Sequence, residues 1–235
     1  MNDKIVTIHQ PDFLPYLGFF HRLMMSDIYI VLDNVQFIRG GSNCWTNRDK
    51  IKTPNGEIWI TIPYLKAPLG TNICDIKINN SIDWRNRNLT QIKDNYYSAE
   101  GFEEVFPYIQ QLYAREYEML ADLTFASIKM LIELFDINIE VKFSSKLNPA
   151  GKSNERIIDL VQKVDSYQYL SGIGAKAYFD SELYERAGIK VIWQNFSHPI
   201  YPQINGGFIP YLSSIDLLLN CGIEKSRNIL REKLT

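Results

Sequence analysis

The chain has 235 residues, of which 46% are hydrophobic and 22% charged, as is typical of a folded globular protein and not of a disordered segment. Its formal net charge of −2 excludes the strong positive field of a general nucleic-acid binder, so no DNA partner is expected. The three cysteines are widely spaced and form no pattern of metal ligands, which predicts neither a disulfide framework nor a metal site.

The sequence shows no internal repeat and no Gly/Ser-rich linker, so residues 1–235 are expected to form a single domain. A proline at position 11 precedes any apolar core near the beginning, which is unlike a secretory signal. No uncharged apolar run approaches the ~18 residues that span a bilayer. We therefore expect a cytoplasmic protein without membrane insertion.

The first predicted elements are a strand at residues 4–8, a loop at 9–15, a helix at 16–26 and a strand at 28–32. Proline cannot donate to a strand ladder, so the two prolines of the loop end the first strand. The second strand is apolar throughout, which is typical of the middle of a parallel sheet that helices cover on both faces.

A β-hairpin is predicted next, with strands at 44–52 and 57–64 joined by a Thr-Pro-Asn-Gly turn. Asn-Gly between two strand-like runs is a strong turn signal. Residues 82–135 are predicted to be helical, because their leucine, isoleucine and tyrosine residues recur at near-helical spacing. At that spacing these side chains are packing residues first.

The last hundred residues alternate between strands and helices. The predicted elements are a strand at 139–143, a helix at 154–164, a strand at 167–170, a helix at 175–187, a strand at 190–193, a helix at 211–220 and a polar terminal helix. Gly188 and Gly222 stand where a helix needs a left-handed C-cap. The sequence therefore predicts an α/β fold with a mostly parallel central sheet flanked by helices, an inserted β-hairpin and a helical middle segment.

The first candidate site is the His9-Gln10-Pro11 turn, at the carboxyl end of the first strand, where parallel sheets bind ligands. His9 can carry a proton near neutrality, and Gln10 adds a neutral donor and acceptor. Hydrogen bonds to loop carbonyls are the alternative explanation. The order strand, HQPxFLPxxG, helix, strand has the outline of a nucleotidyltransferase-type opening, although Phe19 replaces the usual histidine. For Gly18 itself, helix packing is an equally good explanation.

The second candidate is the turn from Ser171 to Lys176, which also contains Gly172 and Gly174. Backbone N–H groups at a strand-to-helix turn favour an anion, and Lys176 adds a cation. A glycine-rich connection with Ser171 as an N-cap is the alternative. Phosphate or carboxylate binding is the functional interpretation.

A third candidate is the charged strand of the hairpin. Arg48, Lys50 and Lys52 share one strand face at a period of two and could receive a diphosphate. A solvated charged surface is the alternative. The fourth candidate is the loop with His198, Tyr201 and Gln203, which follows the strand at 190–193. In a parallel sheet this loop opens on the same side as His9.

One further helix, at 211–220, combines a leucine face with polar residues. The polar residues are predicted to be an exposed face and not a site; they are Ser213, Ser214, Asp216 and Asn220.

Several motifs together resemble the WbqC-like family. The matching segments are HQPDFLPYLGFFHRL, LDNVQF, NRDKIKTPNG, SGIGAKAYFD, HPIYPQ and FIPYLSSIDLLLNCG, from about Ile5 to Gly222. Tyr16 and Phe19 stand where the family commonly has tryptophan and tyrosine. The family's motif residues fall at His9, Gln10, Pro11, Gly18, Asp33, Gln36, Asn47, Arg48, Ser171, Gly172, Tyr178, His198, Tyr201 and Gln203.

The resemblance implies a role in O-antigen, lipopolysaccharide or other surface-polysaccharide biosynthesis, with glycine transfer onto an amino sugar as the suggested activity. The corresponding hypothesis is an aminoacyl transferase whose partners are a nucleotide-linked amino sugar and a small acyl donor. His9 or His198 would accept the proton of the attacking amine. Phosphates would lie on the Ser171–Lys176 turn, Arg48 and Lys50, while Gln10, Tyr201 and Gln203 would orient sugar hydroxyls.

An amide needs an activated acyl group, so ATP is the expected activator of an acyl adenylate; a thioester or an aminoacyl-tRNA donor is equally compatible. The rival hypotheses are a non-catalytic nucleotide-sugar-binding accessory protein and a nucleotidyltransferase-like enzyme of the same pathway. A homodimer also stays open at this stage.

Overall fold

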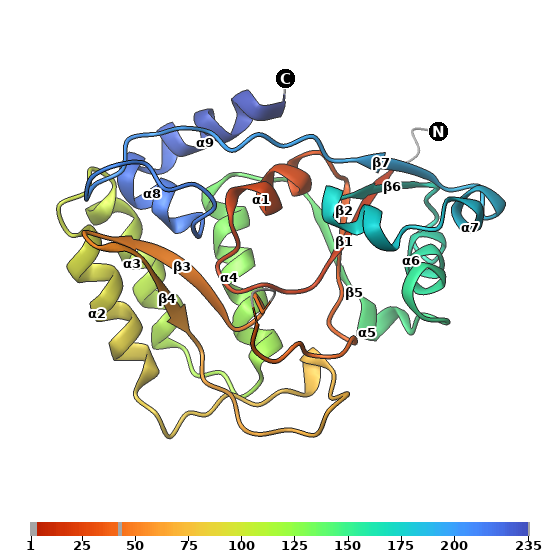
Figure 1. Cartoon of the computed structure of the whole chain (residues 1–235), viewed down its shortest axis with the longest axis horizontal. Helices are drawn as coiled ribbons and strands as arrows, with labels where there is room; N and C mark the ends of the chain where they lie inside the picture. The colour runs from red at the N-terminus through yellow and green to blue at the C-terminus, as the bar shows by residue number, and fades with distance from the viewer. Residues whose placement is uncertain (1–3, 42–43, 235) are drawn as a thin grey trace.

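A computed structural model of the chain describes residues 4–41 and 44–234 (Figure 1). Within these residues, five parallel strands form a sheet in the order β5-β2-β1-β6-β7. The strands are β1 (Ile5–His9), β2 (Ile28–Val31), β5 (Glu140–Phe143), β6 (Gln168–Ser171) and β7 (Lys190–Trp193). The predicted α/β class with a parallel central sheet is confirmed.

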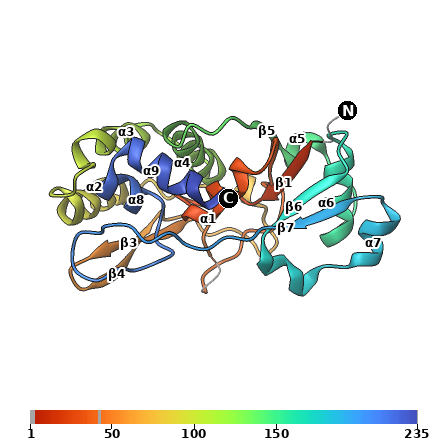
Figure 2. The same cartoon turned by 90° about the horizontal axis from the view of Figure 1, so that it is seen from above.

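The helices gather at two ends of the molecule. They are α1 (Leu17–Met24), α2 (Trp84–Tyr96), α3 (Phe102–Ala114), α4 (Leu120–Leu134), α5 (Ser144–Leu147), α6 (Ser153–Gln162), α7 (Ser181–Arg186), α8 (Ile215–Cys221) and α9 (Ile223–Arg231), with short 3-10 turns η1 (Ile73–Asp75), η2 (Ile173–Tyr178) and η3 (Glu232–Leu234). Seen from above, α2, α3, α4 and α8 lie at one end, and the sheet with α6 and α7 lies at the other (Figure 2). The predicted helical middle segment is therefore confirmed as α2, α3 and α4.

The strand order reverses at the centre of the sheet. If the strands of this sheet are numbered by their order in the chain, they lie side by side in the order 3-2-1-4-5. The chain therefore adds β2 and β5 on one side of β1, and then β6 and β7 on its other side. Thr7 of β1 lies opposite Tyr29 of β2 on one side and opposite Leu170 of β6 on the other. In doubly wound sheets, ligands bind beyond the carboxyl ends of the strands at such a reversal point.

Apolar side chains leave both faces of this sheet. Val6 and Ile8 belong to a smaller cluster that includes Leu160 of α6. Tyr29 and Val31 point to the opposite face and join a larger cluster built from α1 to α4, α8 and the hairpin. Since successive strand residues face opposite sides, helices must cover both faces, as the apolar second strand predicted.

The predicted hairpin forms as β3 (Arg48–Thr53) and β4 (Gly56–Thr61), paired antiparallel. The two strands pack against α2, away from the parallel sheet (Figure 1). Gly56 has φ +111°, a conformation that side chains other than glycine rarely adopt, which explains the Asn-Gly signal. The hairpin thus completes the helical end of the molecule.

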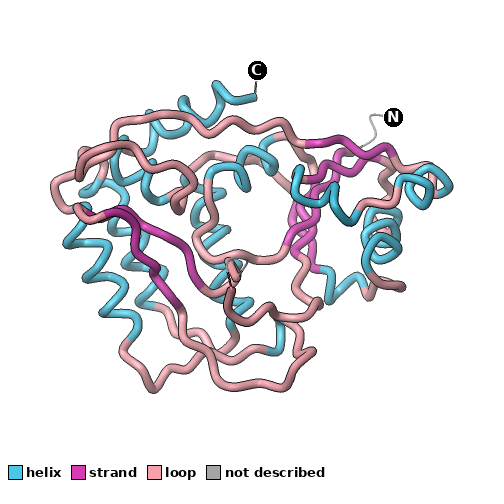
Figure 3. Tube along the Cα trace, in the orientation of Figure 1, coloured by secondary structure: helices cyan, strands magenta, loops and turns pink. Residues whose placement is uncertain are grey.

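Two predicted helices are wrong in extent. The predicted helix at 175–187 is η2 followed by α7, because the Asp180 side chain accepts a hydrogen bond from the backbone N–H of Leu183 and starts a new helix. The predicted helix at 211–220 begins only at Ile215. Tyr211 has φ +59°, and Ser213 forms an isolated β-bridge with Tyr16, so the preceding turn cannot be helical. A long loop, residues 194–214, leads into this helix (Figure 3).

The polar face predicted to be exposed near α8 is instead buried. The residues Ser213, Ser214, Asp216 and Asn220 are at most 5% exposed. The Asp216 carboxylate accepts hydrogen bonds from Tyr96 Oη at 2.6 Å, Tyr201 Oη at 2.9 Å and Gln203 Nε2 at 2.7 Å. Buried polar groups are stable when paired, so this network joins α2, α8 and the long loop.

Candidate functional site

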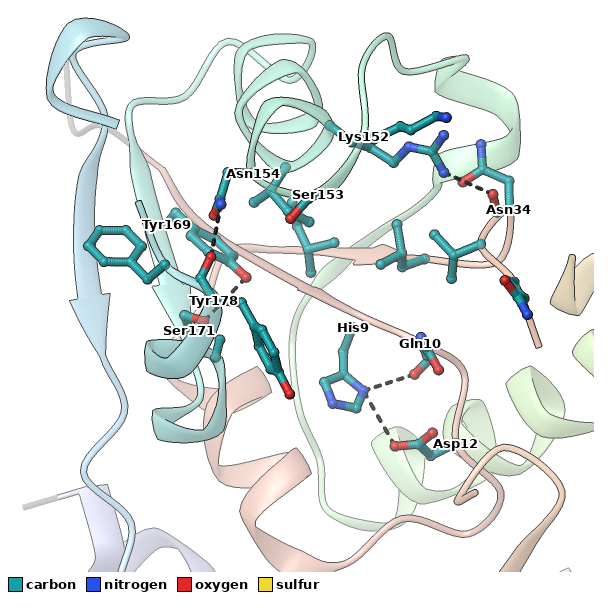
Figure 4. Close-up of a pocket in the computed structure, with 18 of the residues that line it drawn as sticks. His9, Gln10, Asp12, Asn34, Lys152, Ser153, Asn154, Tyr169, Ser171 and Tyr178 are labelled. Atoms are coloured by element: carbon teal, nitrogen blue, oxygen red, sulfur yellow. Dashed lines mark hydrogen bonds and ion pairs between the residues drawn. The ribbon is translucent and has the colours of Figure 1, made fainter. Parts of the chain in front are cut away.

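Two neighbouring cavities lie beyond the carboxyl ends of β1 and β6. The larger has a volume of about 1050 Å³ and is lined by the loops after β1, β2 and β6 and by the start of α6 (Figure 4). The smaller has a volume of about 450 Å³ and lies between α1 and the β6–η2 turn. The residues that line both are Ile8, His9, Tyr169, Ser171 and Ala175. The two cavities therefore adjoin each other at His9.

His9 is the last residue of β1, and its side chain is 35% exposed. Its Nδ1 lies 3.0 Å from the carbonyl oxygen of Gln10. A carbonyl only accepts, so Nδ1 donates the hydrogen and Nε2 keeps its lone pair. Burial, followed by the charge of Arg22, lowers the pKa of His9 to about 3, which leaves the imidazole neutral at pH 7.

Asp12 is a site residue that the sequence reasoning missed. Its Oδ2 lies 3.5 Å from His9 Nδ1, and its carboxyl group lines the larger cavity (Figure 4). Burial raises the pKa of Asp12 to about 7, partly opposed by Arg22. A group that titrates near neutrality in a cavity is suited to proton transfer.

The start of α6 is a second feature that the sequence reasoning missed. Lys152, Ser153, Asn154 and Arg156 line the larger cavity, and no side chain of the described residues caps the helix. Free N–H groups and the helix dipole favour an anion there, and the two cations add to this preference. The sequence signal is Gly151-Lys152-Ser153, which precedes a predicted helix and matches the end of the phosphate-binding pattern GxxxxGK[ST]. Lys146 replaces the first glycine of that pattern.

In the smaller cavity, Arg22 of α1 approaches the turn after β6. The residue is 6% exposed, and its Nε has no hydrogen-bond partner among the described residues. A Cβ added to Gly172 would lie 2.6 Å from Arg22 Nη1. Three aromatic residues also line this cavity; they are Tyr16, Phe196 and Tyr211.

The structure brings part of the predicted site together. The predicted residues that line the larger cavity are His9, Gln10, Gln36, Ser171 and Tyr178. Those that line the smaller one are His9, Ser171, Gly172 and Gly174. The loops after β1 and β6 therefore meet, as expected for parallel strands that end at the same edge.

Other predicted residues do not line either cavity; they are Asp33, Asn47, Arg48, Lys50, Lys176, His198, Tyr201 and Gln203. Asp33 accepts hydrogen bonds from Ser144 Oγ at 2.8 Å and Ser145 Oγ at 2.6 Å. Asn47 donates to the carbonyl of Ile62 at 3.0 Å. These two residues hold loops in place.

The cations of the hairpin are engaged elsewhere. The Arg48 guanidinium lies 4.1 Å from the Trp59 ring centroid, and Lys50 pairs with Glu57. Lys52 is 1% exposed and donates to Gln203 Oε1 at 3.2 Å. Their shared strand face thus packs on the protein itself. Lys176 similarly lies 5.2 Å from the Trp193 ring centroid.

The predicted residues of the loop after β7, His198, Tyr201 and Gln203, do not reach the cavities. His198 Nδ1 donates to the carbonyl of Pro199 at 2.8 Å, and the ring lies 5.0 Å from that of Tyr211. Because Tyr211 lines the smaller cavity, His198 sits one ring behind the cavity wall. Tyr201 and Gln203 belong to the buried network of Asp216.

The described residues contain neither a cluster of metal ligands nor a membrane-spanning helix. Within residues 4–41 and 44–234, no group of three or more His, Cys, Asp or Glu side chains is placed to hold a metal ion. Across the same ranges, no helix has the length and apolar character to cross a membrane.

The strand order and the paired cavities define a doubly wound α/β protein with a crevice at the reversal point of its sheet, where proteins of this class bind ligands. Residues 10–228 match the WbqC-like protein family, and the chain belongs to this family. It is similar to the uncharacterized protein Rv1507c of Mycobacterium tuberculosis, with 29% identity over 224 residues that cover 94% of this chain and 95% of that protein. No solved structure matches the chain significantly.

Proposed function

We propose that this protein transfers an aminoacyl group, with glycine as the simplest case, onto the amine of a nucleotide-linked amino sugar in O-antigen or surface-polysaccharide biosynthesis. The observation that carries the proposal is the pair of unequal cavities that meet at His9. An acyl transfer needs two bound substrates whose reacting atoms are held within a few ångströms of each other.

The larger cavity suits the acceptor. Its volume of about 1050 Å³ is at the upper end of ordinary ligand pockets, as a nucleotide sugar requires. The uncapped start of α6 with Lys152 and Arg156 would hold the diphosphate. Trp45 and Tyr178 offer aromatic faces to a base or a sugar ring.

The chemistry needs one proton acceptor at the junction. The lone pair of the sugar amine attacks the acyl carbon, the C–N bond forms, the bond to the leaving group breaks, and the amine nitrogen loses a proton. His9 Nε2 would take this proton, which its pKa of about 3 permits only while ionised Asp12 stabilises the imidazolium. Ionised Asp12, 3.5 Å from Nδ1, would stabilise the imidazolium, as carboxylates do in hydrolase triads.

The leaving group comes from an activated donor. An acyl adenylate made from ATP and glycine, a glycyl thioester and a glycyl-tRNA all satisfy this balance, because each releases a better leaving group than the hydroxide that a free carboxylate would lose. The small cavity limits the part of the donor that enters it to a small acyl group and its immediate neighbours.

The test is an incubation of the purified protein with a dTDP-linked amino sugar and, in separate arms, ATP with glycine, glycyl thioester, or glycyl-tRNA. Mass spectrometry should detect the sugar nucleotide with one added glycyl residue in one arm. Tight binding of the sugar nucleotide with no product in any arm over hours would replace the proposal with a non-catalytic accessory protein. Nucleotidyl transfer would appear instead as a released pyrophosphate and a new sugar nucleotide.

A further inference from the structure

Arg22 is a buried cation that forms no ion pair with any of the described residues. It lies in the last turn of α1 and is 6% exposed. Among residues 4–41 and 44–234, no carboxylate oxygen lies within 4 Å of its guanidinium, and its Nε is unpaired. Taking a charge out of water is costly unless hydrogen bonds and an opposite charge compensate it.

The surroundings of Arg22 compensate this charge only in part. The position near the C-terminus of α1 favours a cation, and the ring of Phe19 lies 6.0 Å away. The charge of Arg22 lowers the pKa of both His9 and Asp12. Arg22 and Asp12 nevertheless do not form an ion pair in the structure. The guanidinium thus keeps donors for a ligand.

Gly172 gives the guanidinium its space. Its φ of −72° is available to any residue, so conformation does not require glycine there. A Cβ at this position would lie 2.6 Å from Arg22 Nη1, far inside van der Waals contact. Gly174, two residues on, has nothing within 4 Å of its corresponding position. The absence of a side chain at residue 172 therefore lets Arg22 reach the cavity wall.

We propose that Arg22, with the smaller cavity around it, is the subsite for one oxyanion of the acyl donor, a carboxylate or a phosphate group. The planar guanidinium presents paired donors that match such groups. Ser171 and Gln194 are polar neighbours in the same cavity, and its volume of about 450 Å³ suits a small ligand. The assignment rests on the proposed function for the identity of the donor, whereas anion binding itself needs no turnover.

The test is calorimetric titration with two probes, inorganic phosphate and glycine, on the wild-type chain, on Arg22→Gln and on Arg87→Gln. Arg87 is exposed on α2, so its variant loses the same charge far from the cavity. We expect Arg22→Gln to weaken binding of at least one probe by about tenfold or more, and Arg87→Gln to match the wild type. Phosphate binding alone identifies a phosphorylated donor, and glycine binding identifies a free carboxylate. Equal affinities in the two variants, or no binding of either probe to the wild type, would overturn the assignment.

Thermal unfolding separates loss of binding from loss of folding. In buffer without phosphate or glycine, Arg22→Gln should unfold at the same temperature as the wild type or higher, because the variant no longer buries an unpaired charge. Saturating probe should raise the unfolding temperature of the wild type and of Arg87→Gln only. A lower unfolding temperature of Arg22→Gln in the probe-free buffer would show that Arg22 serves the fold and would contradict the assignment.

Gly172→Ala tests the same subsite with every charge retained. The added methyl group should displace the guanidinium and weaken binding of the probe by about tenfold. Gly207→Ala is the matched control, since Gly207 lies in an exposed loop with nothing within 4 Å of the added atom. Unchanged binding in Gly172→Ala would contradict the role of this turn, even if every variant failed to form the amide.

Discussion

Burial moves two neighbouring residues in opposite directions on the pH scale. His9 is held neutral because its pKa falls to about 3, while the pKa of Asp12 rises to about 7. At neutral pH the pair is therefore a neutral base beside an acid that is partly ionised. This arrangement is the chemical centre of the proposed transfer.

The first prediction concerns the two histidines. His9→Ala should lower the rate of amide formation by about 100-fold or more, because it removes the only histidine that lines either cavity among the described residues. His198→Ala should retain most of the rate, since Tyr211 separates it from the smaller cavity. Product formation measured by mass spectrometry distinguishes the two, and full activity of His9→Ala would remove His9 from the mechanism.

The second prediction concerns how the rate of transfer depends on pH. If ionised Asp12 stabilises the imidazolium, the rate of transfer should rise as pH increases through about 7, where Asp12 loses its proton. Asp12→Asn should be slower and should lack this rise. A wild-type rate that is flat between pH 6 and 8 would contradict the role of Asp12.

The third prediction concerns stability. The folded protein binds the Asp12 proton more tightly than the unfolded chain, because the pKa rises from 3.8 to about 7. Stability is therefore lost as pH rises from about 4 to 7. Asp12→Asn should be more stable than the wild type by about 2 kcal/mol at pH 8, with a smaller difference at pH 5. Denaturant unfolding at the two pH values measures this difference in stability. The same difference at pH 5 and pH 8 would contradict a raised pKa of Asp12.

Single residues were predictable from sequence where their position alone gave them a role. His9 and Ser171 end their strands and Gln10 follows one directly, so a parallel sheet brings them to one edge. Asp12 and Arg22 could not be found in this way. Their importance comes from burial by segments that are distant in the sequence, and no local pattern encodes that burial.

At the scale of elements, one carboxylate connects parts of the chain that are more than a hundred residues apart. Asp216 of α8 accepts a hydrogen bond from Tyr96 of α2, and Gln203 of the long loop is bound to both Asp216 and Lys52 of β3. Deleting one member of a buried, charged network leaves its partners unsatisfied.

The fourth prediction follows from this network. Asp216→Ala should lower the free energy of unfolding by roughly 3 kcal/mol, because two tyrosine hydroxyls and one amide lose their acceptor in the interior. Glu182→Ala on α7 is a suitable control, since among the described residues Glu182 pairs only with Arg186, and this pair is exposed. Similar urea midpoints for the two variants would contradict the structural role of Asp216.

The strands and the hairpin were predictable because their apolar runs and the Asn-Gly turn are local signals. The boundary between η2 and α7 was missed because a single Asp180 cap outweighs the surrounding helical composition. The burial of the polar side of α8 could not be predicted from its own sequence, because its hydrogen-bond partners Tyr96 and Tyr201 come from other elements.

At the scale of the whole molecule, strand order was the feature that sequence could not supply. Alternating strands and helices predict a parallel sheet, but they leave open which strands are neighbours. The placement of β1 beside β6 decides that the two loops of the site meet. The rest of the architecture follows from burying both faces of that sheet.

The fifth prediction concerns the expected single domain. Because the two apolar clusters share the strand β2, they should unfold together. Leu160→Ala in the smaller cluster and Leu123→Ala in the larger one should each lower the midpoint of one common transition, at a cost of about 2–5 kcal/mol. Tryptophan fluorescence and circular dichroism should report coincident curves, whereas two separate steps would divide the chain into two domains.

The common wall of the two cavities has a practical consequence for inhibitor design. A bisubstrate compound that links an acidic head group to a sugar-like arm through a neutral tetrahedral connector would place the connector beside His9. Once one arm is docked, the other arm is present at a high effective concentration, so the linked compound should bind far more tightly than either fragment alone.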